Sequence, residues 1–362
     1  MKILITYASA GAGHQKAAEA LLQGIQKVAG HQAVLADSLD YTSPFYKNLY
    51  RKTYTILISK IPWAWGIFFQ LADVPFLIPL VRYVRRTQNA LNAKPLQEFL
   101  KKEKFDYILS THFFPTEVVA HLKRTGVIHA RLMTVVTDFD VHSIWLADGV
   151  DRYAVASDWT RKKMEFLKVV PEKITVTGIP TDEKFSWRRD KGEMRRKLGL
   201  QENIFTVLVA TGSFGIGPIE KIIAAIHNIQ VIVVCGHNKN LFARLSRAKK
   251  DLVKVFGLVN NMDELMAASD VMVTKPGGLS ICEALASHLP MIFFNAIPGQ
   301  ETGNIRVLKA HGVGISDCTI EQIAQKLQEF NSSKEQYAAA VEQTKALARP
   351  NAVHDIIKLI KF

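Results

Sequence analysis

The alternation of short apolar runs with stretches of helical spacing, which restarts once in mid-chain, constrains the fold of this sequence more than any other feature. An apolar run at 2–8 leads into a glycine turn and then into apolar residues spaced as on one helix face over 16–28. After a charge-rich stretch at 182–199, a second apolar run at 205–210 again leads into a glycine-rich turn. Because alternating strands and helices build parallel sheets, we expect an α/β protein with two successive Rossmann-like domains.

Length and composition agree with two domains. The chain has 362 residues and a hydrophobic fraction of 48%, sufficient for two cores. We place an N-terminal domain at 1–180 and a C-terminal domain at 181–345, and expect a helix near 345–362 to pack back on the first. The three cysteines are far apart, which disfavours zinc and disulfide sites and suits a reducing cytosol. No run of about 18 uncharged apolar residues predicts a transmembrane helix.

The first glycine turn ends in a histidine. It reads Gly11-Ala-Gly13-His14, and Lys16 stands where a dinucleotide fingerprint needs its third glycine. Glycines let another group approach the backbone, and ligand sites form at the carboxyl edge of parallel sheets. A neutral imidazole there can take a proton from a hydroxyl. Gly11, Gly13 and His14 are therefore site candidates; the alternative is a histidine that caps its own helix.

The glycine-rich turn of the second half has the form of a phosphate site. Gly212, Ser213 and Gly215 follow an apolar run and precede a helix, so their backbone N–H groups suit a phosphate. Glycine-rich turns are common, so this turn alone does not establish a phosphate site.

A later turn, at 274–286, is more informative. Gly277 and Gly278 are followed by Ser280 and Glu283. On the functional interpretation, the glycines admit a diphosphate and Glu283 accepts hydrogen bonds from a ribose diol. On the alternative, Ser280 and Glu283 form a capping box, and spacing alone does not separate the two.

A fourth motif lies at 298–304. Gln300, Glu301 and Asn304 follow an apolar run in a glycine-rich loop, which places them at the same sheet edge. Amide and carboxylate groups side by side offer donors and acceptors to a polyhydroxyl ring. The alternative is a polar surface loop.

The stretch from 45 to 100 combines aromatic and basic residues. The chain carries a net charge of +13, and the stretch 47–104 holds eleven Lys or Arg against three acidic residues, a local net of +8. A basic excess favours an acidic partner, namely nucleic acid, anionic lipid or a phosphorylated substrate, unless it is only a basic surface. Apolar residues flanked by cations are typical of a segment that lies in a membrane interface; the alternative is an aromatic helix pair in the core. The candidates for lipid contact are Trp63, Trp65, Phe68, Phe69, Arg82, Arg85 and Arg86.

Taken together, these motifs resemble glycosyltransferase family 28, and within it the monogalactosyl- and processive glucosyl-diacylglycerol synthases. The resemblance covers nearly the whole chain, in the family's order. It rests on Gly-Ala-Gly-His at 11–14, Val-Thr-Asp-Phe-Asp-Val-His at 136–142 with Trp145, Gly-Ile-Pro at 178–180, the glycine-rich loop at 212–217, Lys-Pro-Gly-Gly-Leu-Ser-Ile-Cys-Glu at 275–283 and Pro-Gly-Gln-Glu at 298–301 with Asn304.

The resemblance implies a GT-B-type fold, with two Rossmann-like domains facing across a cleft, and an inverting hexosyl transfer without an essential metal or cofactor. His14 resembles the catalytic base, Glu283 the ribose ligand, and Gln300 and Glu301 the hexose ligands. The backbone near Leu258 and Val259 resembles the uracil site. Phe214 departs from the small or polar residue that related enzymes often have, which weakens the phosphate assignment of its turn.

The resemblance implies one reaction. A hexose is expected to pass from a UDP-sugar to the sn-3 hydroxyl of diacylglycerol, or to a glycosyl-diacylglycerol. Glucose is the favoured hexose, and galactose is the alternative. We expect the protein to be peripheral on the cytoplasmic face of an anionic membrane, without a nucleic-acid partner. Asp138 is expected to orient His14 or the acceptor hydroxyl; a divalent metal held by Asp138 and Asp140 is the less favoured use of that pair. A nucleotide-sugar epimerase and a non-catalytic sensor remain alternatives.

Overall fold

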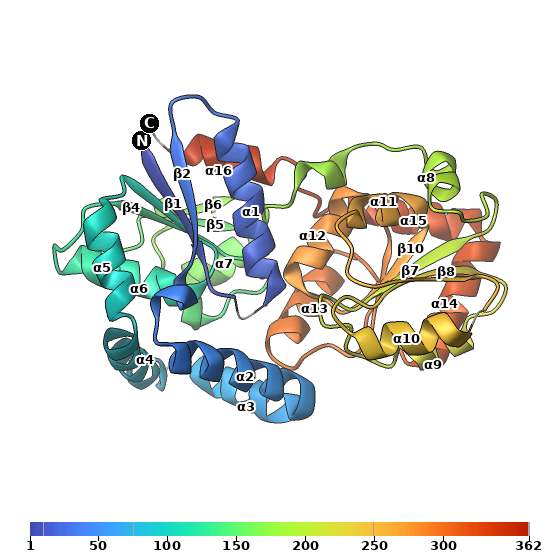
Figure 1. Ribbon diagram of the computed structural model, residues 1–362, viewed down its shortest axis with the longest axis horizontal. Coiled ribbons are helices and arrows are strands. Elements are labelled where there is room, and N and C mark those ends of the chain that lie inside the picture. The colour runs from blue at the N-terminus through green and yellow to red at the C-terminus, as the bar shows by residue number, and fades with distance from the viewer. Residues whose placement is uncertain (10, 75, 249, 361–362) are drawn as a thin grey trace. The chain divides into compact units, whose positions relative to one another are not determined.

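The structure is a computed structural model that describes residues 1–9, 11–74, 76–248 and 250–360. It divides into two compact units, and each is an α/β domain (Figure 1). Unit 1 comprises Met1–Asp182, Ile297–Asn304 and Asn351–Phe362; unit 2 comprises Glu183–Ala296 and Ile305–Pro350. The sequence prediction had one boundary near 180, so the return of 297–304 to unit 1 is a new feature.

Unit 1 is built on a six-stranded parallel sheet with the order β2-β1-β3-β4-β5-β6. Its strands are β1 (Lys2–Tyr7), β2 (Gln32–Asp37), β3 (Tyr107–Ser110), β4 (Arg131–Val135), β5 (Arg152–Val155) and β6 (Ile174–Val176). Its helices are α1 (Ala12–Gln26), α2 (Pro44–Lys60), α3 (Pro62–Ala72), α4 (Ile78–Asn92), α5 (Lys94–Glu103), α6 (Phe113–Arg124), α7 (Asp158–Phe166) and α16 (Ala352–Leu359), with short 3-10 turns at Ser38–Tyr41, Ser143–Trp145 and Pro171–Lys173.

Unit 2 is built on a five-stranded parallel sheet with the order β11-β10-β7-β8-β9. Its strands are β7 (Thr206–Ala210), β8 (Gln230–Val234), β9 (Val253–Phe256), β10 (Val271–Thr274) and β11 (Met291–Phe293). Its helices are α8 (Lys191–Lys197), α9 (Ile219–Ala225), α10 (Lys239–Ala248), α11 (Met262–Ala268), α12 (Gly278–Ala286), α14 (Ile320–Ser332) and α15 (Lys334–Thr344), with a 3-10 turn at Glu183–Ser186; α13 (Gln300–Ala310) begins in unit 1 and ends in unit 2.

The last helix belongs to the first core. α16 packs on α1, where Gly24 leaves room for it: a Cβ at that position would lie 2.3 Å from the side chain of Val353. Ile356 and Ile357 of α16 join the buried cluster that includes Leu21 and Ile25 of α1. The end of the chain thus completes the core begun by its first strand.

Both sheets have a switch point, where consecutive strands begin to add on opposite sides. It falls between β1 and β3 in unit 1 and between β7 and β10 in unit 2. Ligands of open α/β sheets bind at the carboxyl ends of the strands beside this point. The turn between β1 and α1, whose third residue is His14, follows β1, and the turns at 211–218 and 275–277 follow β7 and β10. Three of the glycine turns singled out in the sequence therefore lie at switch points.

Candidate active site

His14, in the first turn of α1, is held by residues that follow the strands β3 and β4. α1 begins at Ala12 with Gly11 as its N-cap and no side-chain cap, so the alternative that His14 caps the helix is wrong. The Nδ1 atom of His14 lies 2.8 Å from the main-chain oxygen of Thr111, which follows β3, and 2.9 Å from Oγ1 of Thr137. A carbonyl oxygen can only accept, so Nδ1 carries the proton. Nε2 of neutral His14 is therefore the basic nitrogen.

The surroundings of His14 are aromatic. The rings of His14 and His112 meet edge to face at 4.6 Å between centroids, and the ring of Trp145 lies 6.0 Å from that of His14. Burial lowers the pKa of His14 to about 4, and it lowers the pKa of His112 well below the usual value, with the neighbouring His14 adding to the shift. Both imidazoles are neutral at physiological pH, as a general base must be.

Asp138 is buried, and its partners differ from those expected. Gln300 donates from Nε2 to Oδ1 of Asp138 at 2.9 Å, and the side chains of Trp145 and Asn304 also hydrogen bond to the carboxylate. Burial, opposed by these hydrogen bonds, raises the pKa of Asp138 to about 6. Within the described ranges no hydrogen bond joins Asp138 to His14, so Thr111 and Thr137 orient the imidazole in its place.

The second carboxylate of the Asp138-Phe-Asp140 motif is also engaged. Lys163 of α7 donates from Nζ to Oδ1 of Asp140 at 2.8 Å. The described residues contain no cluster of three or more His, Cys, Asp or Glu side chains arranged to hold a metal ion. The arrangement around Asp138 and Asp140 is thus one of amide and ammonium partners.

The 297–304 segment, which follows β11, folds onto the loop after β4. Asn304 is fully buried, and its Oδ1 accepts a hydrogen bond from the backbone N–H of Phe139 at 2.8 Å. Glu301 accepts from the backbone N–H of Ile297 at 2.7 Å, and Gln300 reaches Asp138. Asn304 therefore fixes the segment to the loop after β4, and its expected contact with the sugar stays a prediction.

In unit 2, the two glycine turns lie on neighbouring strands. Thr274, the last residue of β10, is paired with Ala210, the last residue of β7, so the turns that follow are adjacent. A Cβ at Gly212 or at Gly277 would meet nothing within 4 Å, which leaves both backbones open to a ligand. Gly212 also has a φ of +80°, a conformation that favours glycine. Two open backbone turns side by side fit a diphosphate.

Glu283 is not part of a capping box. The N-cap of α12 is Gly277, without a side-chain cap, so Ser280 lies inside the helix and the capping-box alternative is wrong. Glu283 is half-buried further along α12. Leu258 and Val259 follow the edge strand β9 at the same carboxyl edge, and the side chain of Leu258 is exposed. Glu283 therefore does not cap α12.

Comparison with known proteins decides the family. Residues 14–181 match the family model for monogalactosyldiacylglycerol (MGDG) synthase, and residues 206–359 match that for the glycosyltransferase family 28 C-terminal domain. A processive diacylglycerol beta-glucosyltransferase of Bacillus cereus is 31% identical over 325 residues, which cover 87% of this chain and 81% of that protein. The chain belongs to glycosyltransferase family 28. It is a UDP-sugar-dependent glycosyltransferase of glycolipid synthesis.

Solved structures agree on the fold. MurG of Acinetobacter baumannii is similar with a TM-score of 0.60 at 12% identity, covering 99% of both chains. The UDP-GlcNAc 2-epimerase of Neisseria meningitidis, solved with UDP-GlcNAc bound, is similar with a TM-score of 0.62 at 12% identity, also covering 99% of both chains. The glycosyltransferase fold of type GT-B is confirmed. A transferase and an epimerase share it, so the sequence relatives and not the fold decide against the epimerase alternative.

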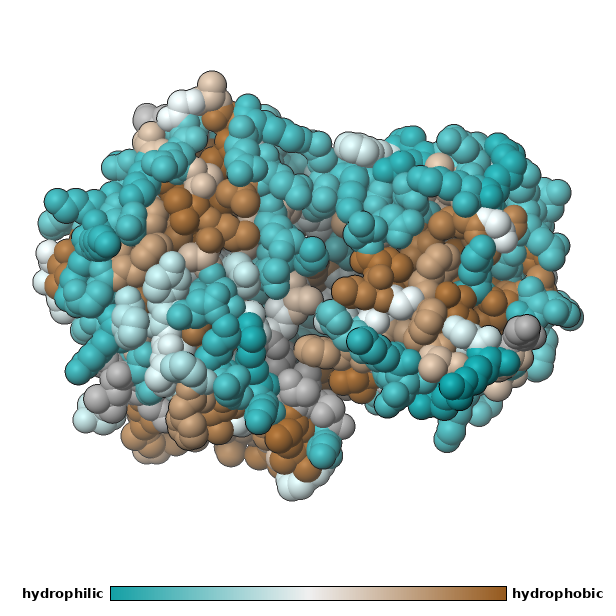
Figure 2. All heavy atoms as spheres, viewed as in Figure 1, coloured by the Kyte–Doolittle hydropathy of each residue, from teal (hydrophilic) through white to brown (hydrophobic). Residues whose placement is uncertain are grey.

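This family 28 glycosyltransferase exposes apolar residues on three consecutive helices. On α2, Phe45, Leu49 and Ile56 share one face with Lys52 and Lys60, and all five are exposed. The set continues on α3 with Trp63, Ile67, Phe68 and Leu71, then with Val74 and Phe76, and on α4 with Leu80, Tyr83 and Val84. Figure 2 shows the apolar colour gathered at the edge of unit 1 where α2 and α3 lie in Figure 1.

The alternative that these helices form an aromatic core pair is wrong for most of the residues. The side chains of Trp63 and Phe76 are 65% and 88% exposed. Trp65 and Phe69, by contrast, are partly buried, and the ring of Phe69 lies 4.0 Å from that of His142. In the described part of the chain no helix has both the length and the apolarity needed to cross a bilayer.

Several basic residues of this stretch pair with acidic residues that lie outside it, which a count of charges within the stretch does not show. Nε of Arg85 lies 2.5 Å from Oε2 of Glu117, and the Arg85 side chain is only 14% exposed. Arg86 pairs with the exposed Asp148 at 3.0 Å. Arg85 is thus an internal ion-pair residue and not a surface cation, while the side chain of Arg82 lies outside the described ones. Lys52 and Lys60 are the cations that share a face with exposed apolar residues.

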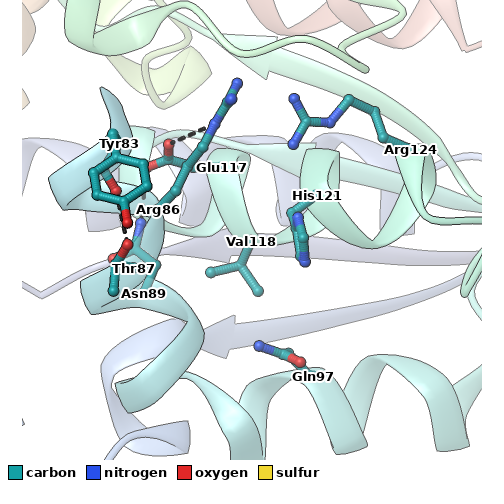
Figure 3. Close-up of a pocket in the computed structure, with 9 residues that line it drawn as sticks. All are labelled: Tyr83, Arg86, Thr87, Asn89, Gln97, Glu117, Val118, His121 and Arg124. Atoms are coloured by element: carbon teal, nitrogen blue, oxygen red, sulfur yellow. Dashed lines mark hydrogen bonds and ion pairs between the residues drawn. The ribbon is translucent and has the colours of Figure 1, made fainter. Parts of the chain in front are cut away.

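Arg86 and Glu117 also line a pocket of about 390 Å³ between α4, α5 and α6 (Figure 3). Val118, His121 and Arg124 of α6 and Gln97 of α5 complete its walls, with Tyr83, Thr87 and Asn89 of α4. Asn89 donates to Glu117 at 2.8 Å, so the buried carboxylate has a hydrogen-bond partner in addition to Arg85. The pocket lies along the second half of α6, whereas Thr111 and His112, which contact His14, precede that helix.

Sequence reasoning missed the residues that hold His14. Thr111 and His112 follow β3, and Thr137 follows β4. Their common signal is a polar residue directly after a buried apolar strand, which the sequence shows. That β3 lies beside β1 is set by the strand order, which the sequence does not show.

Proposed function

We propose that this enzyme transfers glucose from UDP-glucose to the sn-3 hydroxyl of diacylglycerol at a membrane surface, and that it can add a further hexose to the product. The relative from B. cereus, a processive diacylglycerol beta-glucosyltransferase, supports the sugar, the acceptor and the repeated addition. The observation that carries the chemistry is the state of His14, a neutral imidazole whose Nδ1 proton is fixed by the oxygen of Thr111.

The proposed reaction is a single displacement. The acceptor oxygen forms a bond to the anomeric carbon, the bond from that carbon to the diphosphate oxygen breaks, and UDP leaves with the electron pair. The hydroxyl proton passes to Nε2 of His14, and the anomeric configuration is inverted to β. General base catalysis of this kind contributes roughly 10²–10⁴-fold to the rate.

The donor is proposed to bind at the switch point of unit 2. The open backbones at Gly212 and Gly277 would hold the diphosphate, with the N-terminus of α12 stabilising the charge that develops on it. Glu283 would accept hydrogen bonds from the ribose, and Gln300 and Glu301 would contact the hexose. We propose no resident cofactor or metal; the engagement of Asp140 by Lys163 supports this.

The acceptor is proposed to reach the enzyme at a lipid surface. Diacylglycerol is insoluble in water, and the exposed faces of α2, α3 and α4 form an apolar surface of the kind that enters a membrane interface. Lys52 and Lys60 on the α2 face add attraction to anionic lipid, about 1 kcal/mol for each charge near the surface. We propose peripheral binding to the cytoplasmic face of the membrane.

Donor competition with a lipid product readout tests the proposal. Radiolabelled UDP-glucose or UDP-galactose is incubated with the protein and with vesicles that contain diacylglycerol, and the lipids are separated by chromatography. The proposal predicts labelled monoglucosyl- and then diglucosyl-diacylglycerol, with UDP-glucose preferred. Transfer from UDP-galactose alone would contradict the glucose assignment, and label in no lipid from either donor would contradict the function.

A further inference from the structure

The helix α3 has two faces with different surroundings. Trp63, Ile67 and Leu71 lie on its outer face and are exposed. Gly66 and Phe69 lie on the other side and contact the 297–304 segment. One short helix therefore presents an apolar face to the outside and contacts, with its inner face, the segment that carries Gln300 and Glu301.

The contact between α3 and this segment leaves no free space. A Cβ added at Gly66 would lie only 2.5 Å from Cβ of Pro298. Gly299 has a φ of +90°, and a Cβ there would lie 2.7 Å from Cδ1 of the Phe69 ring. Close-packed contacts transmit displacements because their atoms cannot absorb them. A shift of α3 must therefore move the backbone at 298–299.

α3 also holds the loop that carries Asp138. Nδ1 of His142 accepts from the backbone N–H of Ile144, so Nε2 carries the proton and donates to the main-chain oxygen of Phe69 at 2.7 Å. The backbone N–H of Ser143 donates to Oδ1 of Asp73, directly after α3, at 2.8 Å. This loop and the 297–304 segment thus both rest on α3.

The two segments that rest on α3 are joined to each other. Gln300 donates to Asp138, and Asn304 accepts from the backbone N–H of Phe139. The proposed hexose ligands and the loop beside His14 therefore share a support, and that support is a helix whose other face is exposed and apolar.

We propose that α3 couples lipid binding to sugar transfer, with Phe69 as the positioning residue: when the outer face of α3 lies on a lipid surface, its inner face holds the 297–304 segment so that Gln300 and Glu301 contact the hexose. This inference rests on the proposed function. It predicts that a lipid surface improves use of the donor even when the acceptor is not in that surface.

The test separates the surface from the acceptor. The acceptor is a short-chain diacylglycerol kept below the concentration at which it aggregates, and the added vesicles contain phosphatidylcholine and phosphatidylglycerol without diacylglycerol. For the wild type, saturating vesicles should raise kcat/KM for UDP-glucose by about 5-fold or more, the lower end of coupling between distinct sites. Each variant is compared with its own rate without vesicles.

Two neighbouring phenylalanines give a matched pair of variants. Phe69→Ala should sediment with vesicles as the wild type does, yet lose the vesicle-dependent gain in kcat/KM for UDP-glucose. Phe68→Ala removes an exposed ring from the same helix, so it should need more lipid for binding but keep the full gain at saturation. Phe69→Leu retains apolar bulk against Gly299 and should therefore restore the vesicle-dependent gain. Its melting curve, compared with that of Phe69→Ala, shows whether Phe69→Ala loses the gain only because it unfolds.

The outcomes are distinct. If Phe69→Ala binds vesicles and keeps the wild-type gain, or if Phe69→Leu folds normally but loses the gain as fully as Phe69→Ala, the inference is overturned. A wild type that transfers glucose but shows no gain with acceptor-free vesicles overturns the inference alone. A wild type that transfers no hexose to any diacylglycerol overturns the proposed function, and the inference with it.

Discussion

Arg85 and Arg86 are adjacent on α4, but the structure predicts opposite consequences for their removal. Arg85 pairs with Glu117, whose side chain is only 7% exposed, and it also donates from Nη1 to the main-chain oxygen of Ile144 at 3.0 Å. Removing one partner of a buried ion pair costs about 3–5 kcal/mol, because the other charge stays buried. In the variant Asn89 still donates to Glu117 and Arg86 stays 3.9 Å from it, so Arg85→Ala should cost about 3 kcal/mol, the lower end of that range.

Arg86 is the matched control. Its side chain is 38% exposed; it pairs with the exposed Asp148 at 3.0 Å and lies 3.9 Å from Glu117, too far for a hydrogen bond. Exposed ion pairs contribute about 0–1 kcal/mol. Thermal unfolding separates the two, since each kcal/mol shifts Tm by about 2–4 °C in a domain of this size. Arg85→Ala should therefore lower Tm by about 6–12 °C and Arg86→Ala by less than about 4 °C.

A double variant checks the stated cause. If the cost of Arg85→Ala arises from an unpaired buried carboxylate, adding Glu117→Gln should recover part of the lost stability, because a neutral amide is cheaper to bury than a carboxylate. Equal and small losses for Arg85→Ala and Arg86→Ala would refute the reasoning, since they would show that Arg85 behaves as a surface cation.

Four further predictions concern the site and the lipid surface. Glu283→Ala should raise the Kd for UDP about 10–100-fold by calorimetry, because the carboxylate is proposed to bind the ribose; a lower Tm with unchanged Kd would return Glu283 to a structural role. Burial lowers the pKa of His14 from 6.5 to about 4, so its contribution to the free energy of unfolding is complete above about pH 6.5 and is lost as the pH falls towards 4. His14→Gln should remove that part of the pH dependence, at most about 3 kcal/mol; identical denaturation profiles against pH would contradict it. Asn304→Ala should cost about 1–3 kcal/mol in denaturant unfolding by leaving the backbone N–H of Phe139 unpaired, and a neutral result would mean that the amide does not fix the segment. Trp63→Ser should weaken sedimentation with phosphatidylglycerol vesicles without lowering Tm, and unchanged vesicle binding would show that the outer face of α3 does not meet lipid.

The alternation of strands and helices was readable from the sequence because periodicity is a local property. The run at 205–210 became the fully buried β7, and each glycine turn followed a strand as expected. Strand order is not local. β1 lies between β2 and β3, and no pattern in the sequence indicates that β3 is its second neighbour. This strand order brings Thr111, which follows β3, to His14.

The place of the 297–304 segment could not be predicted for a similar reason. It follows β11, a strand of unit 2, and sequence order therefore assigned it to the second domain. Asn304 and Gln300 bind it to the loop after β4, more than 150 residues earlier in the chain. The sequence indicated the polar side chains of this motif, but not that Asn304 binds the backbone of a distant loop.

Charge counting failed because ion pairs cross the boundaries of a window. The stretch 47–104 has a net of +8, but several of its cations pair with acids outside it. Lys47 pairs with Asp40, Arg51 with Asp37, Arg85 with Glu117 and Arg86 with Asp148. The composition of the stretch predicted the exposure of Trp63 and Phe68, but it did not separate them from Trp65 and Phe69, which are partly buried.

The central claim is that His14 serves as the base in hexose transfer to diacylglycerol. The most direct measurement compares the initial rate of labelled glucosyl-diacylglycerol formation by the wild type and by His14→Ala, with UDP binding measured on the same samples. If His14 is the base, the rate should fall roughly 10²–10⁴-fold while the affinity for UDP is retained. A His14→Ala enzyme that binds UDP and turns over within a few-fold of the wild type would contradict it.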